Sequence, residues 1–139
     1  MLPRLGSLQH KKTPMIHNGP ADSGTTLILA HGAGAGMDSP AMEAFAVGLA
    51  GNDLRVVRFE FPYMQRQRET GKNCAPDRLP MLMESWRNTV SIAGSRRLVI
   101  GGKSMGGRIA SMLADDVGAH RLVCLGYPFH PPGAPENVR

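Results

Sequence analysis

The chain has 139 residues, of which 42% are hydrophobic and 19% are charged; this is the size of one domain, whose core buries roughly 68–70% of the unfolded surface. Its longest apolar runs are too short for a membrane-spanning helix, so we expect no membrane association. The formal net charge of +5 does not indicate a nucleic-acid partner, because the densest basic stretch, residues 65–72, contains a glutamate and no aromatic residue for base stacking, but it leaves an anionic substrate open.

Residues 1–24 are predicted to be an N-terminal lead-in, partly irregular. Prolines and a glycine interrupt any amphipathic helix among the first 21 residues, and no apolar core of a secretion signal is present. The two cysteines, Cys74 and Cys124, have neither CxxC nor paired spacing. Their isolation predicts a reducing compartment, which we take to be the cytoplasm, and no metal site.

The first half of the domain is predicted to alternate between strand and helix. The apolar run TTLILA (25–30) ends at the glycine-rich HGAGAG (31–36), and a helix with a polar cap follows over residues 40–50. The run LRVVRFEF (54–61) reads as the next strand. The proline-and-charge stretch 62–80 is expected to be a surface loop.

The second half continues the alternation. Residues 78–92 have helical spacing of apolar residues around Trp86, and a strand (95–101), a helix (104–116) and a final strand (121–129) follow. Trp86 is expected in the core together with four methionines, Met81, Met83, Met105 and Met112.

This order of elements predicts the class of fold. Strands that alternate with helices and are apolar along their length are typical of a mainly parallel sheet covered on both faces. We therefore expect a three-layer α/β domain over residues 25–139.

The stretch GGKS is open to two interpretations, a phosphate-binding loop or a nucleophile elbow. A phosphate loop requires a glycine five residues before Gly102, where the sequence has Arg97, and the residues between them look like strand. An elbow requires G-x-S-x-G between a strand and a helix, and residues 102–106 satisfy this pattern. The sequence therefore predicts Ser104 as a nucleophile.

The HGAGAG loop supports the elbow interpretation. It begins where the first strand of the domain ends, which is where this architecture places an amide that stabilises the oxyanion of a tetrahedral intermediate. The expected oxyanion donors are the backbone amides of Met105 and Ala33, with Gly34 less favoured.

From about residue 25 onward, the chain resembles a family of small predicted α/β-hydrolases, dienelactone-hydrolase-like in outline, which includes the testis-expressed and chromatin-complex hydrolase-like proteins. The resemblance lies in HGAGAGMDSPAM, VVRFEFPYM, GGKSMGGRIASMLAD and LVCLGYPFHPPG. It implies an α/β-hydrolase fold in which Ser104 is the nucleophile and HGAGAG the oxyanion loop. In that family the chain continues into strands carrying an aspartate and then a histidine. The resemblance thus implies that residues 25–139 are an incomplete domain, truncated after the strand that follows the elbow helix.

A serine nucleophile needs a histidine as base and an acid to orient it. Asp115 and Asp116 lie about 15 Å along the helix that follows Ser104, at 1.5 Å per residue, and are too far away. His120 begins the next strand at the opposite edge of the sheet. His130 follows that strand and is the candidate base, although a pocket or loop position is favoured for it.

Further residues are expected near the site. The possible pocket residues are His31, Gly34, Tyr63 and His130. His31 is expected to be structural in its His-Gly turn, and Tyr63 to lie at the pocket rim. Lys103 and Arg108 could meet an anionic group, although exposure to solvent accounts for both.

The sequence predicts a serine hydrolase acting on an ester, thioester or related acyl bond of a small molecule, without cofactor or metal. Without the triad acid and histidine, the chain alone is expected to be inactive or very weak. The alternative is a non-catalytic, hydrolase-like interaction module. The last strand is expected to have an uncovered edge, which favours self-association.

Overall fold

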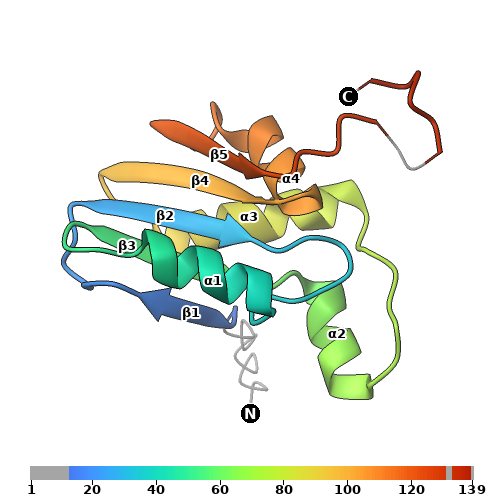
Figure 1. Ribbon diagram of the computed structural model, residues 1–139, viewed down its shortest axis with the longest axis horizontal. Coiled ribbons are helices and arrows are strands. Elements are labelled where there is room, and N and C mark those ends of the chain that lie inside the picture. Colours follow the sequence, from blue (N-terminus) through green and yellow to red (C-terminus); the bar gives the residue numbers. More distant parts are fainter. Residues whose placement is uncertain (1–12, 131–132, 139) are drawn as a thin grey trace, which may run out of the picture.

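The computed structural model describes residues 13–130 and 133–138. A single sheet lies between helices on both faces (Figure 1), with the strand order β1-β3-β2-β4-β5. In chain order the elements are β1 (Met15–Asn18), β2 (Thr25–Ala30), α1 (Pro40–Leu49), β3 (Leu54–Phe59), α2 (Pro62–Thr70), α3 (Leu79–Ala93), β4 (Arg97–Lys103), α4 (Met105–Leu113) and β5 (Arg121–Leu125).

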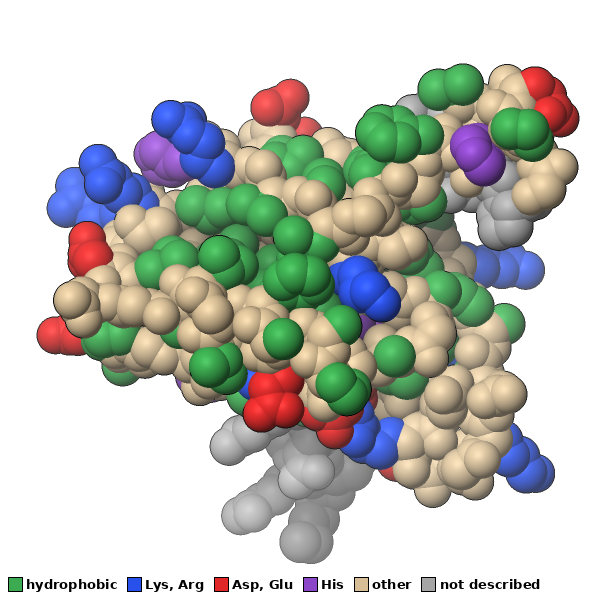
Figure 2. Space-filling view, viewed as in Figure 1, with side chains coloured by type: hydrophobic (Ala, Val, Ile, Leu, Met, Phe, Trp, Pro, Cys, Tyr) green, Lys and Arg blue, Asp and Glu red, His purple; other side chains and the backbone are tan. Residues whose placement is uncertain are grey.

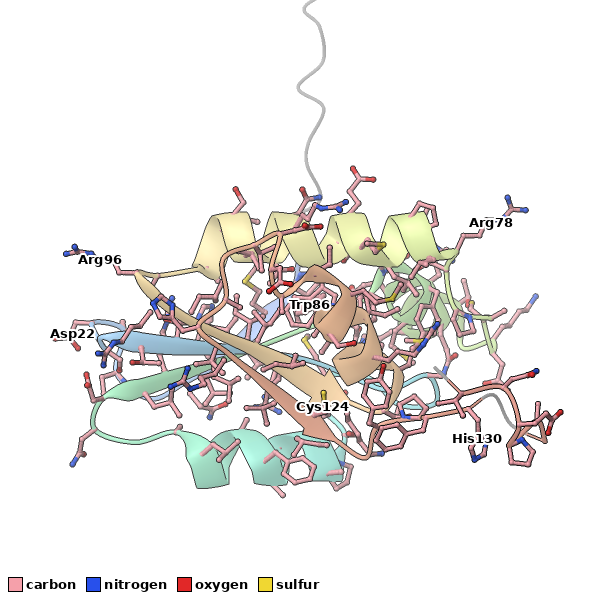
Figure 3. All side chains as sticks on the ribbon, turned by 90° about the horizontal axis from the view of Figure 1, so that it is seen from above. Asp22, Arg78, Trp86, Arg96, Cys124 and His130 are labelled. Atoms are coloured by element: carbon pink, nitrogen blue, oxygen red, sulfur yellow. The ribbon has the colours of Figure 1, made fainter. Side chains whose placement is uncertain are left out.

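The central strands are buried on both faces because their side chains alternate between two apolar clusters. In β2, Leu27 and Leu29 pack with α1, whereas Ile28 and Ala30 pack in the larger cluster with α3 and α4. Figure 3 shows α1 and α3 on opposite sides of the sheet. The strands β3, β2, β4 and β5 pair with one another in parallel. The predicted three-layer, mainly parallel fold is therefore confirmed.

The core on the α3 side contains the one tryptophan of the chain, as expected. Trp86 is fully buried and its ring meets Phe59 edge-on, with the centroids 4.8 Å apart. The prediction for the methionines is wrong at two positions, since Met81 is 47% exposed and Met112 is 43% exposed. Both belong to helices that bury only one stripe of residues, and their exposure places them outside that stripe.

Two elements differ from the sequence-based expectation. The lead-in contains β1, which pairs antiparallel with β3 at one edge of the sheet; residues 1–12 lie outside the described part of the chain. The expected surface loop over 62–80 contains α2, which begins at Pro62 and ends at Gly71, whose φ of 71° is left-handed. Only Tyr63 and Met64 of α2 are buried, so its sequence lacks the apolar stripe of an amphipathic helix.

The last strand is also shorter than expected. It ends at Leu125, because Gly126 has a φ of 70° and turns the chain away from the sheet. The following segment extends beyond the carboxyl edge of the sheet (Figure 1). None of the helices in the described segments is long and apolar enough to cross a membrane.

Candidate active site

Ser104 lies at the turn between β4 and α4 with a strained backbone. Its φ of 50° and ψ of −114° make it the one non-glycine residue with positive φ in the described segments. A conformation of this kind costs on the order of 1–3 kcal/mol and persists only where the surrounding structure imposes it. Here the Ser104 amide donates to the Leu125 carbonyl at 2.9 Å, and the Ser104 carbonyl accepts from the Arg108 amide at 3.0 Å.

The glycines on either side of Ser104 are required by close backbone contacts. A Cβ on Gly102 would lie 2.5 Å from the Ala30 carbonyl oxygen, and one on Gly106 would lie 2.5 Å from that of His31. Both neighbours are backbone atoms of β2 and its following loop, which cannot move aside. The G-x-S-x-G pattern therefore lets the elbow pack directly against the end of β2.

A cavity of about 250 Å³ contains Ser104 and the glycine-rich loop. Its lining residues are Gly32, Ala33, Gly34, Ala35, Ser39, Met42, Lys103 and Ser104. The structure thus brings the expected nucleophile together with Ala33 and Gly34, because the parallel strands β2 and β4 end side by side, with Ala30 opposite Gly102.

The two expected oxyanion donors occupy suitable backbone positions. Met105 is the first residue of α4, and the first four amides of a helix have no acceptor within it. Ala33 lies in the loop that borders the cavity. Among the backbone hydrogen bonds of turns, loops and helix caps in the described residues, none has the amide of Met105 or Ala33 as donor. Ala33 lines the cavity and Met105 does not, although Met105 follows directly after Ser104.

The side chain of His31 fixes the start of this loop through hydrogen bonds in the protein interior. It is fully buried, its Nδ1 lies 2.7 Å from the Gly32 carbonyl oxygen, and its Nε2 accepts from the Phe61 amide at 3.1 Å. The two contacts fix the neutral tautomer with the proton on Nδ1. Burial lowers the pKa of the His31 imidazole, which favours the same neutral form. His31 is structural, and its expected place among the pocket residues is wrong.

Tyr63 holds the middle of the loop. Its hydroxyl donates to the Ala33 carbonyl at 3.0 Å and lies 3.3 Å from the Gly32 carbonyl, while its backbone amide donates to Asp77 at 2.8 Å. The side chain is fully buried and does not line the cavity, so the expected rim position is wrong. Burial, followed by the negative charges of Asp77 and Glu60, raises the pKa of the phenol. Tyr63 therefore remains a hydrogen-bond donor to the loop.

A buried carboxylate, which the sequence analysis missed, holds the far end of the loop. Glu60 accepts from the Met37 amide at 3.1 Å and pairs with Arg68 at 2.7 Å. Arg68 also pairs with Asp38 at 2.8 Å, and its hydrogen bonds hold the pKa of the Asp38 carboxyl below its usual range. A Cβ on Gly36 would meet Glu60 and Arg68. The sequence did not indicate the pairing of Glu60 with Arg68, because Arg68 belongs to α2 and this segment was expected to be a loop.

The other candidate partners of Ser104 lie elsewhere. His130 is exposed and lies on the C-terminal segment beyond the sheet (Figure 3). His120 precedes β5 at the amino end of the strands, where its amide donates to Leu98 at 2.7 Å, and Asp116 faces Arg87 at 3.9 Å. Among the described residues, no histidine lines the cavity at Ser104. A larger cavity of about 500 Å³, between residues 13–14 and α2, does not contain Ser104.

Known proteins share this arrangement of elements. The sequence model of the alpha/beta hydrolase domain matches residues 23–139. The chain belongs to the α/β hydrolase family. No curated protein sequence matches the chain.

Similar solved structures include an α/β serine hydrolase without lid from Xanthomonas campestris, with 19% identity, a TM-score of 0.59, and coverage of 79% of this chain and 53% of that one. An α/β serine hydrolase homologue from Coxiella burnetii is 22% identical, with a TM-score of 0.53 and coverage of 73% and 51%. At these identities the likeness shows the fold alone. The chain spans about half the length of these hydrolases.

Proposed function

We propose that this chain carries the nucleophile and the oxyanion loop of a serine hydrolase that cleaves an ester, thioester or related acyl bond. In this reaction the Ser104 hydroxyl attacks the carbonyl carbon, and the negative charge on the carbonyl oxygen is stabilised by the amides of Met105 and Ala33. The reaction needs no cofactor or metal. Within the family, we place the chain with the small dienelactone-hydrolase-like proteins and their testis-expressed and chromatin-complex relatives.

The observation that carries the proposal is the strained Ser104 beside the glycine-rich loop. The φ of 50° at Ser104 is retained against its intrinsic cost. Gly102 and Gly106 allow the elbow to pack against the end of β2. As a result, Ser104 lines the same cavity as Ala33 and Gly34. A serine with a structural role alone has no need of this geometry, whereas an exposed nucleophile does.

We propose further that the base and acid of the triad lie outside the described residues, since no described histidine lines the cavity. An unactivated serine leaves only binding and the oxyanion amides, which in a triad enzyme retain on the order of 10³–10⁴ acceleration over water. We therefore expect the 139-residue chain to hydrolyse a small activated ester barely above background.

The test compares the chain with Ser104→Ala in two assays, labelling by a fluorophosphonate probe and hydrolysis of p-nitrophenyl acetate. We expect slow labelling that the substitution abolishes, while its thermal unfolding midpoint remains close to that of the parent chain. Labelling that is unchanged in Ser104→Ala contradicts the proposal. Rapid turnover that depends on both Ser104 and His130 contradicts the placement of the base outside the described residues.

A non-catalytic interaction module is the second candidate, and the same observation about histidines favours it. If the chain and its longest natural form both fold but neither labels at Ser104, the interaction module is the better description. We also propose that the chain self-associates through β5. The free cysteines Cys74 and Cys124 support a further proposal, that the protein is cytoplasmic.

A further inference from the structure

Building on the proposed function, we infer that the acyl substrate carries an anionic group, which Lys103 binds beside the nucleophile. Lys103 is the residue directly before Ser104 in the elbow and borders the same cavity. The sequence alone allowed solvent exposure as a sufficient account of this lysine. Its place on the sheet and its surroundings favour a specific role.

The side chain of Lys103 lies on the face of the sheet that α1 covers. Side chains alternate along a strand, and in β4 Val99 packs in the cluster that contains α1 residues, whereas Ile100 packs in the cluster on the α3 side. Lys103 has the same parity as Val99. The cavity opens on this face as well, because Ser39 and Met42 at the start of α1 form part of its wall. Lys103 therefore extends on the same face of the sheet as the cavity that it lines together with the nucleophile.

Lys103 is the only charged residue in the lining of this cavity. In the part of the chain that the structure describes, no carboxylate lies within ion-pair distance of it. The nearest acids of the loop region, Glu60 and Asp38, are both paired with Arg68. A partly buried lysine that has no carboxylate partner among the described residues makes this cavity complementary to an anion.

Other exposed cations of the sheet are remote from this position. Arg96, Arg97 and Arg121 lie at the amino ends of β4 and β5, where Figure 2 shows basic side chains gathered at one end of the molecule. The nucleophile lies at the carboxyl ends of the strands. The positive charge at the cavity therefore comes from Lys103 itself, and its removal tests the inference directly.

The experiment uses two esters that differ in charge, 4-acetoxybenzoate and its neutral methyl ester, and compares their kcat/KM ratio among variants. We expect Lys103→Met to lower the ratio of anionic to neutral ester about tenfold, as the loss of one hydrogen-bonded charge contact should. Lys103→Arg keeps the charge and should retain most of the ratio. Lys72→Met removes an equal charge from an exposed site on the segment after α2 and should leave the ratio unchanged.

The outcomes separate this inference from the proposed function. If turnover depends on Ser104 but the ratio is the same in Lys103→Met, the substrate inference is wrong and the hydrolase proposal stands. If neither ester shows measurable Ser104-dependent turnover, the hydrolase proposal is decided by the fluorophosphonate labelling of Ser104. The anion site is then decided by binding of the unreactive 4-acetamidobenzoate, followed by amide NMR shifts at Ala33 and Ser104. Binding about tenfold weaker in Lys103→Met supports the site, and equal binding overturns it.

Discussion

At the residue scale, the glycines two positions before and after Ser104 tolerate no side chain, because a Cβ at either would meet backbone atoms. In Gly102→Ala the new methyl group would lie 2.5 Å from the Ala30 carbonyl oxygen and 2.7–2.8 Å from backbone atoms of Gly106 and Gly107. We expect a loss of about 2–4 kcal/mol in the free energy of unfolding, measured by urea denaturation.

Gly34→Ala is the matched control for this substitution. It places a methyl group on the glycine-rich loop beside the elbow with no atom within 4 Å, so the free energy of unfolding should change by less than about 0.5 kcal/mol. Equal losses in the two variants would contradict the packing explanation of the elbow glycines.

A second residue-scale prediction concerns the phenol behind the loop. Tyr63→Phe leaves the Ala33 carbonyl without its donor while preserving the ring, so we expect a loss of about 1–2 kcal/mol in stability. Amide hydrogen exchange at residues 32–35 should become faster, because the loop loses one of its fixed contacts. Tyr127→Phe is the control, since the Tyr127 hydroxyl lies 3.4 Å from Ser111 and makes no contact with the loop. Unchanged exchange in Tyr63→Phe would show that the hydroxyl does not restrain the loop.

The buried imidazole adds a dependence on pH. Burial lowers the folded-state pKa of His31 below its usual value of 6.5, so the unfolded state binds more protons, and stability rises with pH. The contribution is complete above about pH 6.5 and is lost as pH falls below this value toward the folded-state pKa. The difference in unfolding free energy between the parent chain and His31→Gln should therefore shrink from pH 7.5 to pH 5. A constant difference would contradict the neutral, buried state of the ring.

At the scale of elements, helix α2 and the loop after β2 are joined through Arg68, which pairs with both Glu60 and Asp38. Arg68→Met leaves the Glu60 carboxylate, whose side chain is 0% exposed, without its cation. We expect a loss of about 2 kcal/mol, below the 3–5 kcal/mol of a fully buried pair because Arg68 is 45% exposed. Adding Glu60→Gln should restore part of the loss.

The control for the ion pair is Arg87→Met. Arg87 faces Asp116 at 3.9 Å, with both side chains more than half exposed, so its removal should change stability by less than about 1 kcal/mol. A loss in Arg68→Met no greater than this would mean that α2 does not support the loop.

The contrast between predicted and observed elements has a physical reason. The sequence was sufficient for β2, β4 and the elbow, because burial on both faces and the crowding at Ser104 restrict residue types strongly. It was insufficient for α2, which is held by polar contacts of Arg68 and Tyr63 rather than by an apolar stripe. It also missed β1, a four-residue edge strand. The polar contacts that hold the glycine-rich loop therefore could not be predicted from the spacing of apolar residues.

At the scale of the whole molecule, β5 forms one edge of the described sheet. Leu122 in this strand is 40% exposed, and a free edge with apolar side chains can pair with another chain. We propose that the chain self-associates through this edge. Leu122→Lys should lower the apparent mass measured by light scattering at high concentration, whereas Val47→Lys on α1, at a 58% exposed position, should not. A monomer over a wide concentration range in the parent chain would contradict the proposal.

The adjacency of β2 and β4 has a consequence for synthesis on the ribosome. Ala30 and Gly102 are paired across parallel strands, so the loop that follows β2 can contact residues 60–63 early but cannot meet the elbow until residues 102–106 have left the exit tunnel. Parallel pairings between distant segments also form slowly. The nascent chain can pair β2 with β3 early, but the other hydrophobic edge of β2 stays unpaired until β4 is synthesised, and protection by a chaperone is valuable during this interval. The capacity of Ser104 to react with a probe should appear late, together with the closure of the sheet.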